Sequence, residues 1–459
     1  MKNNRSNTQQ FEMMTKMPIP KLVIKLGIPT TISMLVTSIY NIADTFFVSQ
    51  LGTSASGAIG IVFGLMAIIQ AFGFMFGQGA GSIVSRMLGA EEVEEASRFA
   101  TVSFVISLIT GLCITILGLL FIHPLMYLLG STDTIYPFAR EYGIFILLSS
   151  PLMMGSFVLN NLLRFEGKAS FAMIGLTIGA VLNIFGDYFL IVHAGMGMSG
   201  AGLSTAVSQT ISFFILWYMF LSKRTQSILS WKHFRAPFHA AKEICITGLP
   251  SLLRQSLGSI STMLLNGQAA VYGDAAVAAM AIVNRISFFV FAVGLGIAQG
   301  FQPVSGYNYG ARKYGRVRQA FYFTVGIGEV LLGATAVAGL LFAPQWISFF
   351  RDDPKVLEIG TLALRLQLIM LFLYPTLLCT NMMLQSVGWN KQASMLSTLR
   401  SGLFFVPMIM IFPALFGIRG IQIAQPLADL LSFLCSLPIL IWFLKDLKKK
   451  EVEIRDADG

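Results

Sequence analysis

The stretch KLVIKLGIPTTISMLVTSIYNIADTFF, residues 21–47, decides the fold. It is mostly apolar and long enough to cross a bilayer as one helix. Asp44 is its only acidic residue. A charge at membrane depth costs at least ~2.5 kcal/mol, even on the most lenient insertion scale. The stretch therefore predicts a spanning helix whose carboxyl group needs a partner, a proton, an ion or a water-filled cavity.

A second long apolar segment offers a partner for this acid. It contains VLNIFGD, residues 181–187, in which Asn183 and Asp187 are four positions apart. Residues at this spacing share one face of a helix. We expect Asp44 and Asp187 to meet across a helix interface.

Composition indicates a membrane protein throughout. The 459 residues are 55% hydrophobic and only 12% charged, and the mean hydropathy is +0.72. These values exclude an ordinary soluble domain. The first 20 residues carry no apolar core followed by a small-residue cleavage site, so the first spanning helix is expected to serve as an uncleaved targeting signal.

Twelve spanning helices are predicted, which gives an all-α polytopic membrane protein. The hydrophobicity comes in blocks of roughly 20 residues or more, the length that spans hydrocarbon as a helix. The predicted ranges are 21–47, 57–85, 99–124, 138–163, 169–193, 200–222, 241–271, 276–304, 318–343, 358–386, 393–416 and 420–444.

Short sequence motifs of the first half of the chain recur in the second half. Gly27-Ile28-Pro29-Thr30 recurs as Gly248-Leu249-Pro250-Ser251, and Gln78-Gly79 recurs as Gln299-Gly300, both at an offset of 221. Further along, Ala169-Ser170 matches Ala393-Ser394 at an offset of 224, and Gly200 matches Gly420 at 220. Two pseudo-symmetric six-helix lobes are therefore expected, and such repeats commonly hold a site near the bilayer midplane.

This repeat defines the expected domains. They are an N-terminal tail over 1–20, a first six-helix lobe over 21–222, a linker over 223–240, a second six-helix lobe over 241–444 and a C-terminal tail over 445–459.

Positive charge predicts the orientation. If the odd gaps between helices lie outside, few basic residues remain there: Arg140, Arg351, Lys355 and Arg419. The positive-inside rule then places both tails and the basic linker in the cytoplasm. The net charge of +10 thus indicates membrane topology, and no nucleic-acid partner is expected. The four Cys and four His form no ligand spacing, so no cofactor or resident metal is predicted.

The two acids have no acidic counterpart in the second half of the repeat. At these offsets Asp44 aligns with Leu265, and Asp187 aligns with Ile411. A purely structural role would tend to appear in both halves, because both halves face the same packing problem. The asymmetry favours a functional role over a structural ion pair or a hydrogen-bonded acid.

The Ala43-Asp44-Thr45 turn, Gln299-Gly300-Phe301-Gln302-Pro303 and Asn308-Tyr309-Gly310-Ala311 resemble the multidrug and toxic compound extrusion (MATE) family over almost the whole chain. The resemblance is greatest to bacterial branches that include MepA-like and DinF-like exporters. It implies a first-lobe cation or proton site with matching residue types at six positions: Asp44, Asp187, Asn183, Thr205, Tyr142 and Asn160. It also implies a monomer in the bacterial cytoplasmic membrane.

Several of these residues have a simpler interpretation. Tyr142 could anchor at the outer interface, Asn161 competes with Asn160 for the lobe interior, and Thr205 could bond its own helix carbonyl. Weaker candidates for a substrate cavity are Tyr40, Asn41, Gln78 and Gln299. The two glutamines recur in both halves, which favours packing.

The sequence also departs from one pattern in the family. A vibrio-type branch places its acidic cation residues in the second lobe, where Glu329 and Asp429 are the acids that we place in helices. Their positions do not match such a site.

The predicted function is a secondary active antiporter. It would export cationic or amphipathic drugs or toxic metabolites in exchange for protons or sodium. Carboxylate, amide and hydroxyl oxygens can take up a proton or a hard cation, so the residues leave the ion open. A flippase of lipid-linked saccharides from the same superfamily is the alternative. No enzyme is predicted, because clustered His, paired metal ligands and nucleophile motifs are missing from the sequence.

Overall fold

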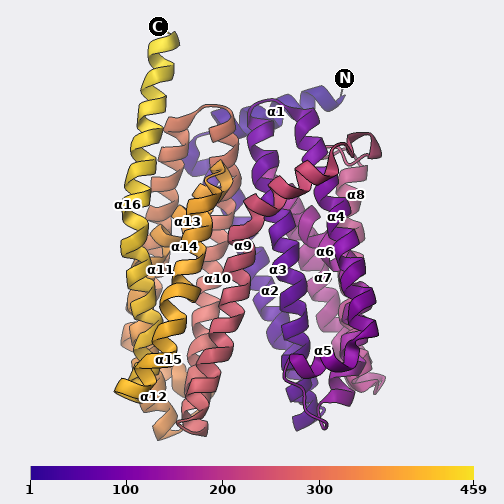
Figure 1. Ribbon diagram of the computed structural model, residues 1–459, viewed down its shortest axis with the longest axis vertical. Coiled ribbons are helices and arrows are strands. Elements are labelled where there is room, and N and C mark those ends of the chain that lie inside the picture. The colour runs from indigo at the N-terminus through magenta and orange to yellow at the C-terminus, as the bar shows by residue number, and fades with distance from the viewer. Residues whose placement is uncertain (1, 459) are drawn as a thin grey trace. The chain divides into compact units, whose positions relative to one another are not determined.

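The computed structural model describes the backbone of residues 2–458 and the side chains of residues 7–456. The described chain is helical almost throughout (Figure 1). Ten of its helices are long and apolar enough to cross a membrane, or eleven when a pair bent by 55° counts as one span. This confirms the predicted all-α polytopic membrane protein.

Helices cover all twelve predicted ranges. Those of the first half are α2 (Ile19–Ser49), α3 (Thr53–Gly89), α4 (Val93–Leu120), α5 (Ile122–Leu128), α6 (Tyr136–Phe165), α7 (Ala169–Asp187), the π-helix η1 (Tyr188–His193) and α8 (Gly197–Leu221). The N-terminal region predicted as a tail also holds a helix, α1 (Lys2–Lys16).

The second half begins after the short 3₁₀-helix η2 (Trp231–His233). Its helices are α9 (Pro237–Ala270), α10 (Asp274–Gly310), α11 (Tyr314–Phe350), α12 (Pro354–Ile369), η3 (Met370–Phe372), α13 (Tyr374–Val387), α14 (Asn390–Thr398), the π-helix η4 (Leu399–Phe404), α15 (Phe405–Phe416) and α16 (Ile418–Asp458). The predicted C-terminal tail continues α16. With the bent pair counted as a span, α9 is the predicted span that does not reach this apolar length within the described chain, and it carries Lys242, Glu243 and Arg254.

Contacts divide the chain into two compact units. One unit runs up to Met14 and then over Ile32–Leu252, and the other combines Thr15–Thr31 with the chain from Leu253 onward. The division therefore falls inside α2 and inside α9, so the N-terminal part of each helix belongs to a different unit from its C-terminal part.

Within the first unit, α6 is the central helix. It packs against α3, α4, α7 and α8, and it buries Tyr142, Ile146 and Leu147 completely. Small residues let these helices approach closely, as is usual in lipid. A Cβ atom on Gly155 of α6 would come within 2.7 Å of the Phe213 ring of α8.

Within the second unit, α10 is the counterpart of α3 in the repeat. It packs against α11, α12 and α13, while α15 packs against α16. The π-helix η4 lies between α14 and α15 and contacts α16.

Glycine contacts repeat between the two units. In the first unit, a Cβ on Gly79 of α3 would lie 2.2 Å from the Ile244 carbonyl oxygen and 2.9 Å from the Gly248 nitrogen of α9. In the second unit, a Cβ on Gly300 of α10 would lie 2.5 Å from Gly27 Cα of α2. Both pairs follow the offset of 221, so the N-terminal part of each repeat's first helix packs by the same device.

The structure corrects one of the predicted offsets. Asn160 Nδ2 donates to the Ala172 carbonyl (2.9 Å), and Asn381 Nδ2 donates to the Ala393 carbonyl (2.7 Å). Both contacts, and the starts of α7 and α14, follow an offset of 221. The offset of 224 for the fourth and fifth helices of each half is therefore wrong by three residues, about one helical turn. Asp187 still has no acidic counterpart, because α15 reads FVPMIMIFPALF.

Candidate functional site

Asp44 lies on α2 in the interior of the first unit and is 1% exposed. Its Oδ2 accepts a hydrogen bond of 2.9 Å from the hydroxyl of Tyr142, which α6 presents. Its Oδ1 is buried and has no hydrogen-bond partner among the described residues. The carboxyl group is thus held from one side and open to a further partner on the other.

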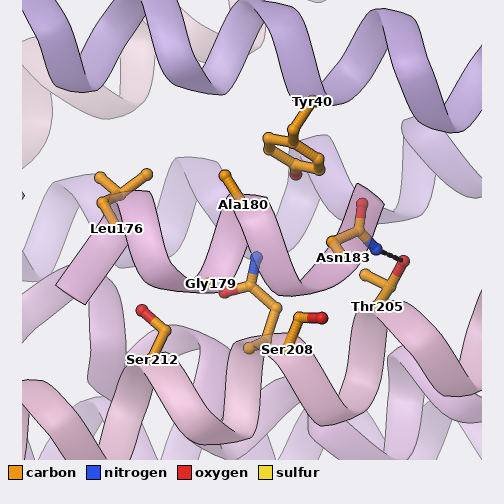
Figure 2. A pocket seen from close by; sticks show the side chains of 9 residues that line it. Tyr40, Leu176, Gly179, Ala180, Asn183, Thr205, Ser208 and Ser212 are labelled. Atoms are coloured by element: carbon orange, nitrogen blue, oxygen red, sulfur yellow. Dashed lines mark hydrogen bonds between the residues drawn. The ribbon is translucent and has the colours of Figure 1, made fainter. Parts of the chain in front are cut away.

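Tyr142 extends this contact into a chain of hydrogen bonds. Its hydroxyl also lies 3.0 Å from the hydroxyl of Thr205 on α8. Thr205 Oγ1 in turn accepts from Asn183 Nδ2 of α7 at 3.1 Å, as Figure 2 shows. Four helices, α2, α6, α8 and α7, therefore each contribute one side chain to a continuous polar path from Asp44 to Asn183.

Asp187 lies one turn beyond Asn183, at the last residue of α7. It is completely buried. Neither of its oxygens meets hydrogen-bond geometry within the described residues, although the Ser204 hydroxyl lies beside this carboxylate and donates to the Asn183 carbonyl (3.0 Å). Asp187 and Asp44 are close enough to interact electrostatically. The structure thus brings the two acids into one site.

The π-helix η1 starts directly after Asp187. π segments are rare and are often found at functional sites, because the altered hydrogen bonding re-aims the neighbouring side chains. No pattern in the sequence predicts this segment.

The cluster can take up a proton or a hard cation. Two carboxylates, the Asn183 amide oxygen and the Thr205 hydroxyl are oxygen donors of the kind that sodium or calcium accepts. Asn183 Oδ1 is also buried without a hydrogen-bond partner among the described residues. Two carboxylates close together in a low dielectric cannot both stay ionised without a large cost in free energy. A proton bound to one of them would therefore neutralise the pair as well as a hard cation would.

The other candidates lie apart from this cluster or at its edge. Tyr40 interacts electrostatically with both acids and lines a small cavity with Asn183 and Thr205 (Figure 2). The carbonyl of Asn41 accepts from Thr45 Oγ1 at 2.8 Å. Asn160 donates instead to the Ala172 carbonyl of α7, and the equivalent contact recurs in the second unit between Asn381 and Ala393.

Gln78 and Gln299 belong to the helix packing. Gln78 Oε1 accepts from Ser251 Oγ of α9 at 2.6 Å, next to the Gly79 contact. Gln299 is buried on α10 of the second unit, beside Gly300.

Three polar residues on α8 were not predicted from the sequence. Ser208, Gln209 and Ser212 line the same small cavity as Asn183. Ser204, Ser208 and Ser212 recur every four residues, and this spacing on one helix face was the available signal.

The second-unit acids have different surroundings. Asp429 forms a two-point ion pair with Arg400, with Nε–Oδ1 at 2.7 Å and Nη2–Oδ2 at 3.3 Å. Glu329 Oε1 accepts from Thr376 at 3.3 Å. Asp429 is therefore neutralised within the chain, unlike the first-unit acids.

These features define a class of protein: a polytopic helical membrane transporter built from an internal repeat, with intramembrane acids in one half. The MatE family model matches residues 29–189 and 250–411. This is more than half of the chain, which therefore belongs to the MatE family. Membership confirms the predicted family and the prediction of a transporter rather than an enzyme.

Known proteins are similar over nearly the full length. The multidrug export protein MepA of Staphylococcus saprophyticus is 26% identical over 441 residues, covering 95% of this chain and 97% of that protein. A crystal structure of MATE in complex with MaL6 is 29% identical with a TM-score of 0.89 and covers 96% of this chain and 99% of its own. An outward-facing multidrug resistance MATE family transporter of the MOP superfamily is also 29% identical, with a TM-score of 0.89 and 95% and 98% covered.

Proposed function

We propose that the chain is a secondary active antiporter that exports organic compounds in exchange for protons or sodium ions. The observation that carries this proposal is the first-unit cluster. Two buried acids lie in one site, and the polar side chains that form hydrogen bonds with Asp44 or with one another there are the neutral Tyr142, Thr205, Asn183 and Ser204. Buried charges in a membrane need neutralisation, and here a mobile cation can supply it.

The cluster couples the ion to transport if the two access states bind that ion differently. Only differential affinity shifts a two-state equilibrium. Asp44 comes from α2, which contains Pro29 near the start of its spanning part, while Asp187 comes from α7. Neutralisation of the pair would remove the repulsion between two like charges on these helices. We assign the coupling role to Asp44, Asp187, Asn183, Thr205 and Tyr142.

The proposed substrates are cationic or amphipathic organic molecules. Intramembrane acids attract cations, and the similar proteins named above include a multidrug export protein. Export would run from the cytoplasm of a bacterial cell, with both termini cytoplasmic, as a monomer.

The alternative of a lipid-linked saccharide flippase has less support. Such a protein should hold phosphate with several cationic side chains. In the second unit, Arg400 is engaged by Asp429, and the first-unit site is acidic.

A transport experiment tests the proposal and chooses the ion. The purified protein in proteoliposomes is given ethidium and one imposed gradient, of protons in sodium-free buffer or of sodium at equal pH on both sides. Ethidium transport driven by either gradient supports antiport and identifies the ion. Transport that requires ATP and does not depend on either gradient would overturn the proposal of an antiporter. Movement of a labelled lipid-linked saccharide without ethidium transport would favour the flippase.

A further inference from the structure

The turn between α3 and α4 in the first unit and the turn between α10 and α11 in the second unit have the same backbone conformation. Glu91 and Arg312, which correspond at the offset of 221, both adopt the left-handed region, with φ of 64° and 56°. The residue that follows each of them, Glu92 or Lys313, donates its backbone N–H to the carbonyl five residues earlier at 2.8 Å. The two turns are therefore structural counterparts.

These two turns carry opposite charges. Residues 90–98 read AEEVEEASR, and residues 311–319 read ARKYGRVRQ. At the offset of 221, the glutamates at positions 91, 92 and 95 correspond to Arg312, Lys313 and Arg316. Both turns follow the second span of their half, so both are predicted on the cytoplasmic side. The orientation of the chain therefore does not explain why one turn is acidic and the other is basic.

The second-unit turn brings its basic side chains to the junction of α1 and α2. Lys313 Nζ donates to the Thr15 carbonyl (3.1 Å), and Arg316 Nη2 donates to the Met17 carbonyl (2.7 Å). Lys16 lies between these two acceptors in the chain and is close enough to Lys313 to interact with it electrostatically. Lys16, Lys313 and Arg316 form a basic cluster, and all three belong to the second unit.

The positive charges of the basic cluster repel one another. Burial lowers the pKa of Lys313, and the charges of Arg316 and Lys16 lower it further. Arg316 also lies in the first helical turn of α11, where the helix macrodipole is unfavourable for a cation and favourable for an anion. A bound anion would offset both effects.

The acids of α16 beside this turn are engaged by other cations. Glu451 Oε1 would lie 2.2 Å from a Cβ on Gly315, so the two segments are in contact. Glu451 pairs with Arg318 at 3.1 Å, and Asp446 pairs with Lys450 at 2.8 Å. Each acid therefore already neutralises a cation outside the basic cluster.

The start of α2 extends the basic cluster toward an apolar surface. Lys21 and Lys25, one and two helical turns after Met17, are exposed. Ile24 (43% exposed) and Ile28 (56% exposed) lie on the same face of the helix, since three or four residues separate these side chains. Basic residues followed by exposed isoleucines match a phospholipid with an anionic headgroup and apolar chains. A soluble anion would need only the charges.

We propose that the basic cluster binds the phosphate group of an anionic membrane lipid, whose acyl chains lie along the exposed isoleucines of α2. Asn308 Oδ1 accepts from Arg316 Nε at 2.9 Å and so fixes the guanidinium. The guanidinium and the ammonium groups of Lys313 and Lys16 supply charged N–H donors for phosphate oxygens. The acidic turn of the first unit would repel the same headgroup. The lipid site includes none of the residues assigned to ion coupling, so it does not depend on the proposed antiport.

Lipid binding by the full purified chain in detergent micelles tests the site. Short-chain phosphatidylglycerol is the probe, phosphatidylcholine of equal chain length is the lipid without net charge, and native mass spectrometry measures the bound lipid. We expect the native protein to prefer phosphatidylglycerol about tenfold or more, and Lys313→Gln/Arg316→Gln to lose most of this preference. Lys232→Gln/Lys242→Gln removes two exposed positive charges from the first unit and should keep it. An equal loss in both double variants, or no loss in either, would overturn the proposal.

A second variant covers failure of the Lys313/Arg316 double variant to fold. Arg312→Glu gives the second-unit turn the residue that the first-unit turn has in the same backbone conformation, and it leaves the contacts of Lys313 and Arg316 in place. The added negative charge should weaken phosphatidylglycerol binding about fivefold or more, and native-like binding would count against the site.

Inorganic phosphate distinguishes the two sources of a phosphate group. At a concentration equal to that of phosphatidylglycerol, inorganic phosphate should not displace the lipid, because it lacks the apolar chains. Full displacement would assign the basic cluster to a soluble anion and overturn the lipid site.

Discussion

At the residue scale, the two acids of the first unit differ from Asp429 in whether a positively charged side chain neutralises them. Asp44 and Asp187 have neutral neighbours and buried oxygens without hydrogen-bond partners in the described chain, whereas Asp429 has Arg400 and Gln425. A carboxylate without a fixed counter-charge can respond to an ion, while one in a two-point ion pair serves the fold.

We predict that Asp44→Asn and Asp187→Asn each abolish gradient-driven export and leave a folded protein. An amide keeps the shape of the side chain, and its oxygen can still accept from Tyr142, but it cannot gain or lose a proton. Stability should change by no more than ~1 kcal/mol, since a neutral hydrogen bond survives. Ethidium transport and thermal unfolding, measured on the same preparations, check both parts.

Asp429→Asn is the matched control for these variants. It leaves Arg400 without its carboxylate, so we expect a loss of roughly 3 kcal/mol in stability, with the ion dependence of the remaining transport unchanged. Normal export by both first-unit variants would refute the coupling role. A lost ion dependence in Asp429→Asn alone would move the coupling site to the second unit.

Sequence reasoning predicts that the two acids share one site, because a lone acid in an apolar run and an acid four residues after Asn183 both need partners. It could not decide which oxygens are bonded. The position of Asn160 against α7 and the hydrogen bonds of Ser208 and Ser212 to backbone carbonyls depend on helix rotation. One residue of register rotates a side chain by about 100°, and no periodicity within a uniformly apolar helix fixes that rotation.

At the element scale, the glycine contacts of α3 and α10 explain why the same Gln-Gly pair occurs in both halves, as Gln78-Gly79 and Gln299-Gly300. The glycine permits backbone contact with the first helix of a repeat, and Gln78 accepts a hydrogen bond from Ser251 beside it. Their recurrence correctly favoured packing, since both halves use the device.

We predict that Gly79→Ala destabilises the protein by about 1–3 kcal/mol, the usual cost of overpacking. The new methyl group would meet the Ile244 carbonyl at 2.2 Å, and backbone atoms cannot move aside as a flexible side chain can. Thermal unfolding measures the change. Gly60→Ala on the same helix is the control, because nothing lies within 4 Å of its Cβ position. Equal stability of the two variants would contradict the close contact.

The linker after α8 is fixed at its start by one buried acid, Glu166, directly after α6. Its carboxylate accepts from the backbone N–H of Gln226 (2.7 Å), and from the backbone N–H (3.1 Å) and the hydroxyl of Ser227. Gln10 of α1 also donates to the Glu166 carbonyl at 2.8 Å. One completely buried residue therefore ties α1, α6 and the linker together within the first unit.

We predict a pH-dependent stability that Glu166→Gln removes. Burial raises the pKa of Glu166 above its ordinary value of 4.5, although Lys168 and the hydrogen bonds oppose this shift. The folded protein then holds the proton more tightly than the unfolded chain does, so stability falls as pH rises from about 4.5 through the raised pKa. Unfolding temperatures of the native protein should show this fall.

Glu166→Gln should lack this pH-dependent fall. Its amide has one oxygen for two backbone donors, so the variant should also lose roughly 1 kcal/mol from the anchor and expose the linker to limited proteolysis. Glu95→Gln, an exposed acid paired with Arg98, should behave as the native protein does. A pH profile of Glu166→Gln that matches the native one would refute the assignment.

The helices themselves were predictable because a run of roughly 20 apolar residues in lipid must satisfy its backbone hydrogen bonds internally, and a helix does this. Three features were not. The break between α12 and α13, the π-helices η1 and η4, and the polar first part of α9 all depend on tertiary neighbours that satisfy backbone and side-chain groups. The offset of 224 failed for a related reason, since short identities such as Ala-Ser are common by chance while helix starts and hydrogen bonds are not.

At the scale of the whole molecule, comparison of the two halves of the repeat distinguishes residues that pack helices together from residues that take part in transport chemistry. Contacts shared by both units, such as Asn160 with Ala172 and Asn381 with Ala393, hold helices together. Differences between the units, the acids of one and the ion pair of the other, mark where the halves have specialised. A vectorial function also needs a defined orientation, and charge predicts that orientation independently of the site.

We predict that the loop after α8 and the end of α16 lie in the cytoplasm, because basic residues there outnumber those at the opposite ends of the helices and the positive-inside rule weighs Lys and Arg near spans. Single cysteines at exposed loop positions test this in a background without the four native cysteines. An impermeant maleimide should label Arg351→Cys on intact cells. It should label Lys232→Cys and Lys449→Cys only after permeabilisation.

Arg351 follows α11, and Lys232 lies in η2, so the two positions are separated by three predicted spans and should fall on opposite sides. The control for access is Lys355→Cys, four residues beyond Arg351 at the start of α12, which should label with it. The reverse pattern would overturn the predicted orientation of both termini. The direction of exchange would not change with it, because an antiporter moves its substrate opposite to the driving ion, and the ion gradient is set by the cell.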